Sequence, residues 1–178
     1  MNDATIEIIQ QEFDLQVKLF CGEISLVVAA DKVKALLLRL RDYGFRVLVD
    51  LSGVDYLSPQ EGTEVFYLLH NPESYERLRV KVFALRGEAI PSICDLWPAA
   101  DWYEREVFDL FGVLFSGHPD LKRILMPDDW QGHPLRRNYA LGEESVAFKH
   151  GVTPKKPSEI IPCSKRRGSR LTMTHELP

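Results

Sequence analysis

Cysteine is scarce in this 178-residue sequence, and long hydrophobic runs are absent. The three cysteines, Cys21, Cys94 and Cys163, are scattered and form no CxxC pair, which argues against a disulfide framework. They are also one short of the four thiols that usually hold an iron–sulfur cluster. The longest aliphatic run, Leu26–Ala30, is far shorter than the ~20 residues that span a bilayer. If the protein works at a membrane, we expect it to work from the aqueous side.

Motifs of several enzyme classes are also missing. The sequence has no GxGxxG after a strand, no GxxxxGK[ST] and no GxSxG, so it predicts no dinucleotide loop, no nucleoside-phosphate loop and no nucleophile elbow. No cysteine lies in an evidently activating setting. The first residues lack the basic and apolar regions of a signal peptide, and we expect a reducing, cytoplasm-like compartment.

The composition that remains is typical of a soluble globular protein, with 45% hydrophobic and 27% charged residues. Charge is unevenly distributed: residues 151–178 carry six Lys/Arg against two Asp/Glu, whereas the preceding residues are acidic. The basic cluster at 165–170 could contact nucleic acid, but the acidic body opposes that interpretation. A solvated tail or a tail that docks on a protein fits the charge pattern better.

Hydrophobic periodicity predicts an α+β fold, with helices packed on one face of a largely antiparallel sheet. The expected order is helix, two strands, helix and three strands, at residues 4–13, 15–19, 24–28, 33–40, 45–51, 65–69 and 80–84. Asp31 is the expected N-cap of the second helix and Gly44 its end. A further helix is expected at 99–111.

Beyond Gly112 the chain is rich in Gly, Pro, His, Asp and Arg, and no apolar period persists. We therefore divide the sequence into an α+β body at 1–90, a helix and contact segment at 91–140, and an extended or disordered basic tail at 141–178. A long structureless stretch is unusual inside a compact domain, so we expect this extended C-terminal arm to lie on another protein.

The last predicted helix carries Asp101, Arg105 and Asp109 at intervals of four, a spacing that favours an exposed ladder of ion pairs. A second hypothesis is a metal-dependent hydrolase that uses His118 and His133 with nearby carboxylates, which are Glu104, Glu106, Asp120, Asp128 and Asp129. No HxH or HxxxH pair supports that hypothesis, and loop histidines that bond the backbone are favoured over it.

Three motifs carry a family resemblance: residues 104–112 (EREVFDLFG), 115–125 (FSGHPDLKRIL) and 132–136 (GHPLR). Together with residues 51–56, 91–93 and 96–102, they resemble the C subunit of respiratory complex I, which is the 30-kilodalton-type or J-type subunit of NADH–quinone oxidoreductases. The resemblance spans roughly residues 30–140. It departs at residues 137–138, where Arg-Asn replaces the usual Lys-Asp.

The resemblance implies a peripheral-arm subunit of a proton-translocating NADH–quinone oxidoreductase that has no cofactor of its own. Flavin, iron–sulfur clusters and quinone would then be bound by partner subunits, with quinone between the hydrogenase-large-subunit-like and hydrogenase-small-subunit-like members. The complex would lie at the cytoplasmic side of the bacterial cell membrane, which this chain would reach only through the complex. It implies no nucleic-acid partner.

The resemblance also makes the motif residues interface residues, and no catalytic, cofactor or metal residue is expected. Ion pairs that fix the helix and its docking are expected from Glu104, Arg105, Glu106 and Asp109. Hydrogen bonds from the arm to the large-subunit-like neighbour are expected from His118, Arg123, His133 and Arg136. Which of these pairs are intramolecular and which cross the interface is left open by the sequence.

Overall fold

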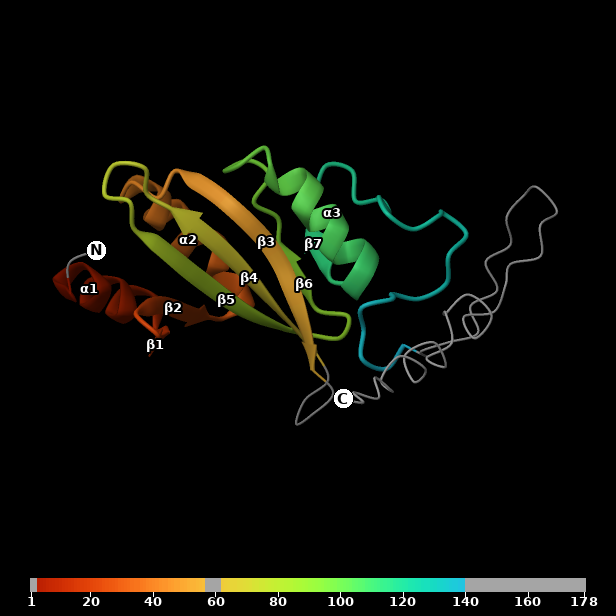
Figure 1. The fold of residues 1–178 in the computed structure, drawn as a ribbon, viewed down its shortest axis with the longest axis horizontal. Helices are drawn as coiled ribbons and strands as arrows, with labels where there is room; N and C mark the ends of the chain where they lie inside the picture. The colour runs from red at the N-terminus through yellow and green to blue at the C-terminus, as the bar shows by residue number, and fades with distance from the viewer. Residues whose placement is uncertain (1–2, 57–61, 140–178) are drawn as a thin grey trace, which may run out of the picture. The chain divides into compact units, whose positions relative to one another are not determined.

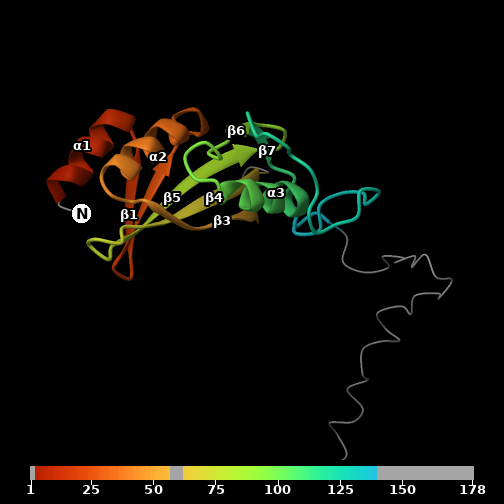
Figure 2. The ribbon, with the colours of Figure 1, turned by 90° about the horizontal axis from the view of Figure 1, so that it is seen from above.

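A five-stranded sheet with helices on one face forms the body of the protein (Figures 1 and 2). The computed structural model describes residues 3–56 and 62–139. The elements, in chain order, are α1 (Asp3–Phe13), β1 (Gln16–Phe20), β2 (Glu23–Val28), a 3₁₀ turn (Ala30–Lys32), α2 (Val33–Asp42), β3 (Val47–Tyr56), β4 (Gly62–His70), β5 (Arg77–Leu85), β6 (Ala89–Pro91), α3 (Ala100–Phe111) and β7 (Leu114–Ser116). The expected α+β class is confirmed.

The strand order in the main sheet is β1-β2-β5-β4-β3. All neighbours pair antiparallel except β2 and β5, which pair in parallel, and the crossover between them runs through α2, β3 and β4. The expected hairpin of β1 and β2 is present, and Cys21 and Gly22 both have positive φ at its turn. A second, two-stranded parallel sheet of β6 and β7 has no counterpart in the sequence prediction, because each strand has only three residues.

The core lies between the main sheet and its helices. In α2, the predicted apolar face is buried at every position, namely Val33, Leu36, Leu37 and Leu40. Alternate residues of β4 and β5 meet this face, including Tyr67 and Val80. Burial of one such aliphatic side chain contributes roughly 1.5–3 kcal/mol, so this layer is the main source of stability.

The predicted N-cap of α2 is wrong. Asp31 lies inside the 3₁₀ turn, and the residue before the helix is Lys32, which makes no side-chain cap. The chain enters α2 directly from the preceding turn, in which the N–H of Lys32 is already bonded to the carbonyl of Ala29. Asp31 has the residue type of an N-cap, but the 3₁₀ turn runs directly into α2 and leaves no N-cap position at Asp31.

Helix α3 covers the same sheet face as α2, at the edge formed by β3. A side chain at Gly53 of β3 would meet the ring of Phe111, with its Cβ only 3.2 Å from Cδ2. The absence of a side chain at this position thus lets α3 approach the strand closely. The helix ends at Gly112, which adopts the left-handed conformation at φ 73°.

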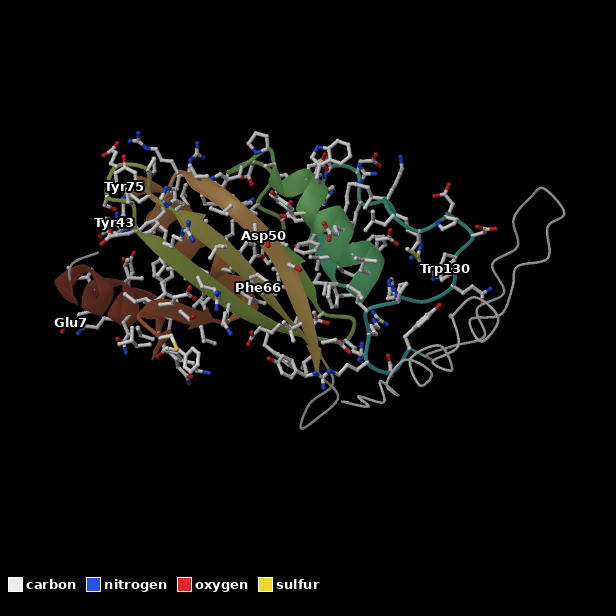
Figure 3. The ribbon with its side chains drawn as sticks, in the orientation of Figure 1. Glu7, Tyr43, Asp50, Phe66, Tyr75 and Trp130 are labelled. Atoms are coloured by element: carbon white, nitrogen blue, oxygen red, sulfur yellow. The ribbon has the colours of Figure 1, made fainter. Side chains whose placement is uncertain are left out.

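The opposite face of the sheet has no helix over it among the described residues, and it mixes charged and apolar side chains. Asp50 and Phe66, labelled in Figure 3, lie on this face of β3 and β4. Lys81 and Glu64 form an ion pair there at 2.8 Å. None of the described helices is both long enough and apolar enough to cross a membrane.

The described residues up to Tyr139 group into one compact unit, and the division expected at residue 90 stays a prediction. The tail expected at 141–178 lies outside the described residues.

Candidate functional site

The motif-bearing part of the chain consists of α3 and the stretch at 117–139, which we call the loop segment. The loop segment contains no helix or strand, and it follows β7 and passes beside α3 (Figure 1). Hydrogen bonds from charged side chains to backbone groups therefore take the place of a regular backbone ladder. Four groups of such bonds define its geometry.

The first group is centred on Asp109, whose side chain is fully buried. Its Oδ1 accepts from Arg123 Nη1 at 2.7 Å. Its Oδ2 accepts the backbone N–H groups of Ile124, Leu125 and Met126 at 3.1, 2.7 and 2.8 Å. Burial opposes ionisation, but the N–H of Met126 and the Arg123 guanidinium outweigh it, so the pKa of Asp109 lies below its ordinary value. One carboxylate thus fixes the turn at residues 124–126 and pairs with a largely buried arginine.

The second group closes the C-terminal end of α3. Arg136 donates to the carbonyls of Phe111 and Gly112, and His133 Nδ1 donates to the carbonyl of Asp109 at 2.9 Å. These carbonyls have no partner within the helix, and the positive guanidinium also suits the negative end of the helix dipole. A Cβ at Gly112 would overlap both Arg136 and His133, so glycine is required for space as well as for its positive φ. Burial lowers the pKa of His133, which keeps the ring neutral near pH 7.

The third group surrounds Glu104, which is fully buried in the first half of α3. Its Oε1 accepts the backbone N–H of Ile93 at 2.8 Å, and Cys94 Sγ donates to its Oε2 at 3.5 Å. His118 Nε2 lies 3.1 Å from Asp101 Oδ1 and 4.0 Å from Glu104 Oε2. Burial raises the pKa of Glu104 above its ordinary value, because these hydrogen bonds do not fully replace water.

The fourth group was not anticipated as part of the site. The side chain of Asp55 in β3 is 1% exposed, and it accepts from Thr63 Oγ1, Arg86 Nη2 and the backbone N–H of Arg137. The last bond attaches the end of the loop segment to the sheet. The only sequence signal was the position of Asp55 in the motif at 51–56, which gave no partner.

The ladder predicted along α3 is wrong. Asp101 faces His118 and Asp109 faces Arg123, while Arg105 donates to the carbonyls of Lys122 and Arg123 at 3.3 and 3.4 Å. Asp109 is buried at the side of the helix where the loop segment crosses, and its oxygens are taken by Arg123 and by backbone N–H groups of that segment, so it does not pair with Arg105.

The remaining predicted residues lie at the surface of α3. The guanidinium of Arg105 lies over the ring of Trp102, 5.2 Å from its centroid, and Glu106 is exposed. Exposed large apolar side chains in this part of the chain are Trp102, Leu114, Leu125 and Leu135.

The structure does not bring His118 and His133 into one ligand set. His118 belongs to the Glu104 group, whereas His133 contacts the carbonyl of Asp109 and the ring of Phe108. The histidine pair of the hydrolase hypothesis is therefore divided between two groups within residues 3–56 and 62–139.

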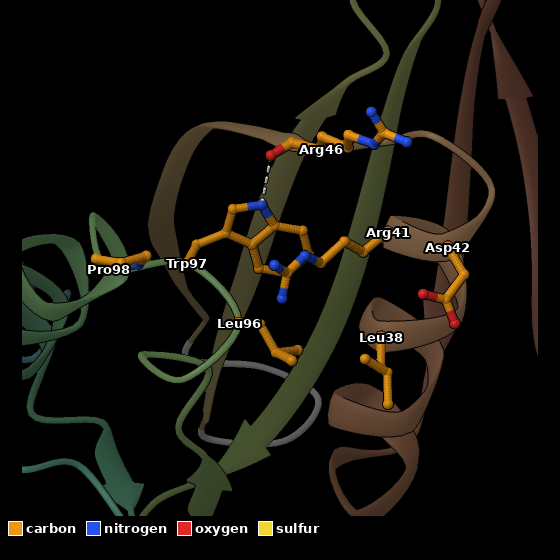
Figure 4. A pocket seen from close by; sticks show the side chains of 7 residues that line it. All are labelled: Leu38, Arg41, Asp42, Arg46, Leu96, Trp97 and Pro98. Atoms are coloured by element: carbon orange, nitrogen blue, oxygen red, sulfur yellow. Dashed lines mark hydrogen bonds between the residues drawn. The ribbon is translucent and has the colours of Figure 1, made fainter.

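A surface pocket of about 540 Å³ lies elsewhere, between α2 and the turn that precedes α3 (Figure 4). Trp97 forms part of the pocket wall, and its Nε1 donates to the carbonyl of Arg46 at 2.8 Å. The residues that line it are Leu38, Arg41, Asp42, Arg46, Leu96, Trp97 and Pro98. None of the predicted site residues is among them.

Comparison with known proteins identifies the family. The model described as the 30 Kd subunit of respiratory-chain NADH dehydrogenase matches residues 26–145, which include α3 and the whole loop segment. The chain belongs to this family. The C subunit of NADH-quinone oxidoreductase from Roseiflexus castenholzii is 44% identical over 133 residues, covering 72% of this chain and 76% of the relative. The corresponding subunit from Moorella thermoacetica is 47% identical over 145 residues, covering 80% and 97%.

Two solved structures contain a chain with the same fold. A trypsin-resistant fragment of Nqo5 superposes with a TM-score of 0.61 at 30% identity, covering 67% of this chain and 98% of that one. The membrane-bound sulfane sulfur reductase, an archaeal respiratory membrane complex, has a chain that superposes with a TM-score of 0.68 at 25% identity, covering 78% and 85%. The family resemblance and the expected class, a subunit of an oxidoreductase complex, are confirmed.

Proposed function

We propose that this chain is a peripheral-arm subunit of a proton-translocating NADH–quinone oxidoreductase, and that α3 and the loop segment form its docking surface. In this proposal it binds the hydrogenase-large-subunit-like and hydrogenase-small-subunit-like members and supports assembly and electron transfer from NADH to quinone. Flavin, iron–sulfur clusters and quinone belong to those partners, and the chain reaches the cytoplasmic face of a bacterial membrane only through them.

The observation that carries the proposal is the internal use of the motif charges. Asp109, Arg123 and Arg136 are bonded within the chain, and together they hold a loop without regular secondary structure in one shape. A surface that is already ordered loses little conformational entropy when a partner binds. The loop segment is thus suited to recognition by a neighbouring protein.

Because the motif charges are bonded within the chain, we assign the contact with the partner protein to the side chains that remain exposed. Leu125 and Leu135 are 57% and 50% exposed, and Trp102 is 58% exposed under the Arg105 guanidinium. Aromatic residues and arginine are enriched at protein interfaces, and apolar side chains at their centre are desolvated on binding. The motif charges then shape the surface, and these residues touch the partner.

Assembly of a substituted chain tests the proposal. We expect Leu125→Asp and Leu135→Asp to reduce incorporation of the chain into the complex, because each places a charge in a desolvated contact. Leu19→Asp is the matched control, since Leu19 is 72% exposed on the β1–β2 hairpin. Affinity purification in mild detergent, with the co-purifying chains and NADH–quinone activity measured, gives the readout.

Equal incorporation of the Leu125 and Leu135 variants and the wild type, with full quinone reduction, would contradict the location of the docking surface. Copurification of no cofactor-bearing partner with the wild-type chain would contradict the proposed function as a whole. Arg105→Ala provides a milder variant, expected to leave the isolated chain soluble while weakening incorporation, because Arg105 bonds the carbonyls of Lys122 and Arg123 at the protein surface.

A further inference from the structure

A compact set of metal-ligating side chains lies beside the first half of α3. The donor atoms of Cys94, Asp101 and His118 all lie within 4.8 Å of one another, the one such group in residues 3–56 and 62–139. Glu104 Oε2 adjoins it, 3.5 Å from Cys94 Sγ and 4.0 Å from His118 Nε2. The four residues come from the turn before α3, from α3 itself and from the loop segment, so only the folded chain brings them together.

This group differs from the other buried carboxylates in its charge balance. Asp109 pairs with Arg123, and Asp55 pairs with Arg86. Glu104 is as deeply buried, yet no lysine or arginine of the described residues forms an ion pair with it. The fully buried hydroxyl of Tyr67 has no hydrogen-bond partner in the described part of the chain, and its pKa is raised by burial first and by the nearby Glu104 second. Buried charges in proteins are normally paired or bound to a metal ion.

We propose that Cys94, Asp101, Glu104 and His118 bind one divalent transition-metal ion of the zinc type. In a tetrahedral zinc site with sulfur, nitrogen and oxygen ligands, the donor atoms are roughly 3.3–3.7 Å apart, as follows from the usual metal–ligand bond lengths. The measured separations are 3.1 Å for His118–Asp101, 3.5 Å for Cys94–Glu104 and 4.0 Å for His118–Glu104. The donor atoms of Cys94, Asp101 and His118 all lie within 4.8 Å of one another, so rotation of these side chains can close the set around an ion.

The surroundings orient two of the ligands. The backbone N–H of Ile93 holds Glu104 Oε1 at 2.8 Å, which leaves Oε2 facing the group. In the metal-free chain the backbone N–H of Asp120 donates to His118 Nδ1 at 3.0 Å, so Nε2 already faces Asp101 before an ion binds. The bond from Ile93 to Glu104 persists in the metal-bound state, and bonds of this kind outside the ligands set the direction of the donor atoms in metal sites.

Proton balance on metal binding follows from these bonds. In the metal-free chain, Nδ1 of His118 accepts a hydrogen bond, so Nε2 carries the proton. When Nε2 binds the ion, Nε2 gives up its proton and Nδ1 takes one from solvent, so the ring stays neutral. The hydrogen bond from Asp120 N–H to Nδ1 is then broken, and Asp120 N–H donates to water instead. Cys94 binds as thiolate and releases its thiol proton to solvent. The thiolate and two carboxylates then supply three negative charges against the two positive charges of the ion.

Cobalt(II) is a suitable probe, because cobalt bound to a thiolate absorbs in the near ultraviolet whereas free cobalt does not. The full chain carrying Cys21→Ser and Cys163→Ser keeps Cys94 as its single thiol. We expect this protein to bind one equivalent of Co²⁺ with a thiolate-to-cobalt band, and Zn²⁺ to displace it. Absence of stoichiometric uptake, or uptake without the thiolate band, would overturn the proposal.

Substitutions in the same background locate the site. Cys94→Ser should abolish the band, and Asp101→Asn and His118→Asn should each weaken Co²⁺ binding at least tenfold. His70→Asn is the matched control, since His70 Nδ1 bonds the carbonyl of Glu76 on the sheet, and it should bind as the parent does. Unchanged Co²⁺ binding in both Asp101→Asn and His118→Asn, or an equal loss in His70→Asn, would overturn the assignment. Circular dichroism of each variant establishes folding, and Asp101→Asn preserves shape at a partly exposed position. Because the isolated chain is measured, the result is independent of assembly into the respiratory complex.

Discussion

The sheet with α1 and α2 and the region formed by α3 and the loop segment are stabilised in different ways. The first is held by apolar burial and regular backbone ladders, with Leu36, Tyr67 and Val80 all fully buried. The second is held by single side chains that each bond several backbone groups, as Asp109 does with three consecutive N–H groups. Stability in the first region is distributed over many contacts, whereas in the second it depends on a few charged residues.

The largest expected effect is in the second region. Asp109→Ala removes the carboxylate that pairs with the Arg123 guanidinium and leaves three backbone N–H groups without their acceptor, and we expect a loss of about 3–5 kcal/mol in the free energy of unfolding. Urea denaturation of the isolated chain measures this directly. A loss below about 1 kcal/mol would mean that water replaces the carboxylate at little cost, and that the loop segment does not depend on it.

Glu104→Gln tests the contrast between a buried carboxyl group whose pKa is raised, Glu104, and one whose pKa is lowered, Asp109. The pKa of Glu104 is raised by burial in the folded state, so ionisation of Glu104 costs stability as the pH rises through that folded pKa. Gln has the same shape and no charge, so the variant should become more stable relative to wild type as the pH is raised from about 4 to about 7. The nearby ionisable groups are Tyr67, Cys94, Asp101 and His118.

The contribution of Asp109 to stability changes with pH in the opposite direction, because the pKa of Asp109 is lowered in the folded state. Its stabilisation is present above the ordinary aspartate pKa and is lost as the pH falls toward the lower folded value. For Glu104, melting curves of wild type and Glu104→Gln in metal-free buffer from about pH 4 to about pH 7 measure the predicted change in relative stability. A stability difference independent of pH would contradict the raised pKa of Glu104.

The smallest effect is expected in the sheet region. Leu36→Met conserves volume in a fully buried position of α2, and we expect a loss of less than about 1.5 kcal/mol. The same denaturation experiment compares it with Asp109→Ala. If Leu36→Met is the more damaging of the two, the contrast between distributed and concentrated stability is wrong.

The sequence predicted most of the sheet region, because local periodicity there reports directly on burial. The spacing of Val33, Leu36, Leu37 and Leu40 placed α2 and its buried face correctly. Alternation located the strands, although β3 extends to Tyr56, beyond the expected end at residue 51. The parallel pairing of β2 with β5 was not specified, because strand partners are chosen by contacts far apart in the chain.

In the site region, the sequence identified the important residues and misassigned some of their partners. Intervals of four along α3 made Arg105 the natural partner of Asp101 and Asp109, yet the partners are His118 and Arg123 from the loop segment. Helical spacing specifies which residues share a face, but it contains no information on which distant segment crosses that face. The docking role of these residues stays a prediction.

The amino-acid sequence by itself determined the family, the α+β class and the ends of the principal helices, since motif order and hydrophobic period are local properties. Only the tertiary structure decided which groups surround the buried carboxyl groups: Asp109 and Asp55 meet arginines, and Glu104 meets His118 and Cys94. The physical reason is that a charge within a folded protein interacts with whatever the chain places a few ångströms away, and in this protein those groups are 10 to 31 residues distant in sequence.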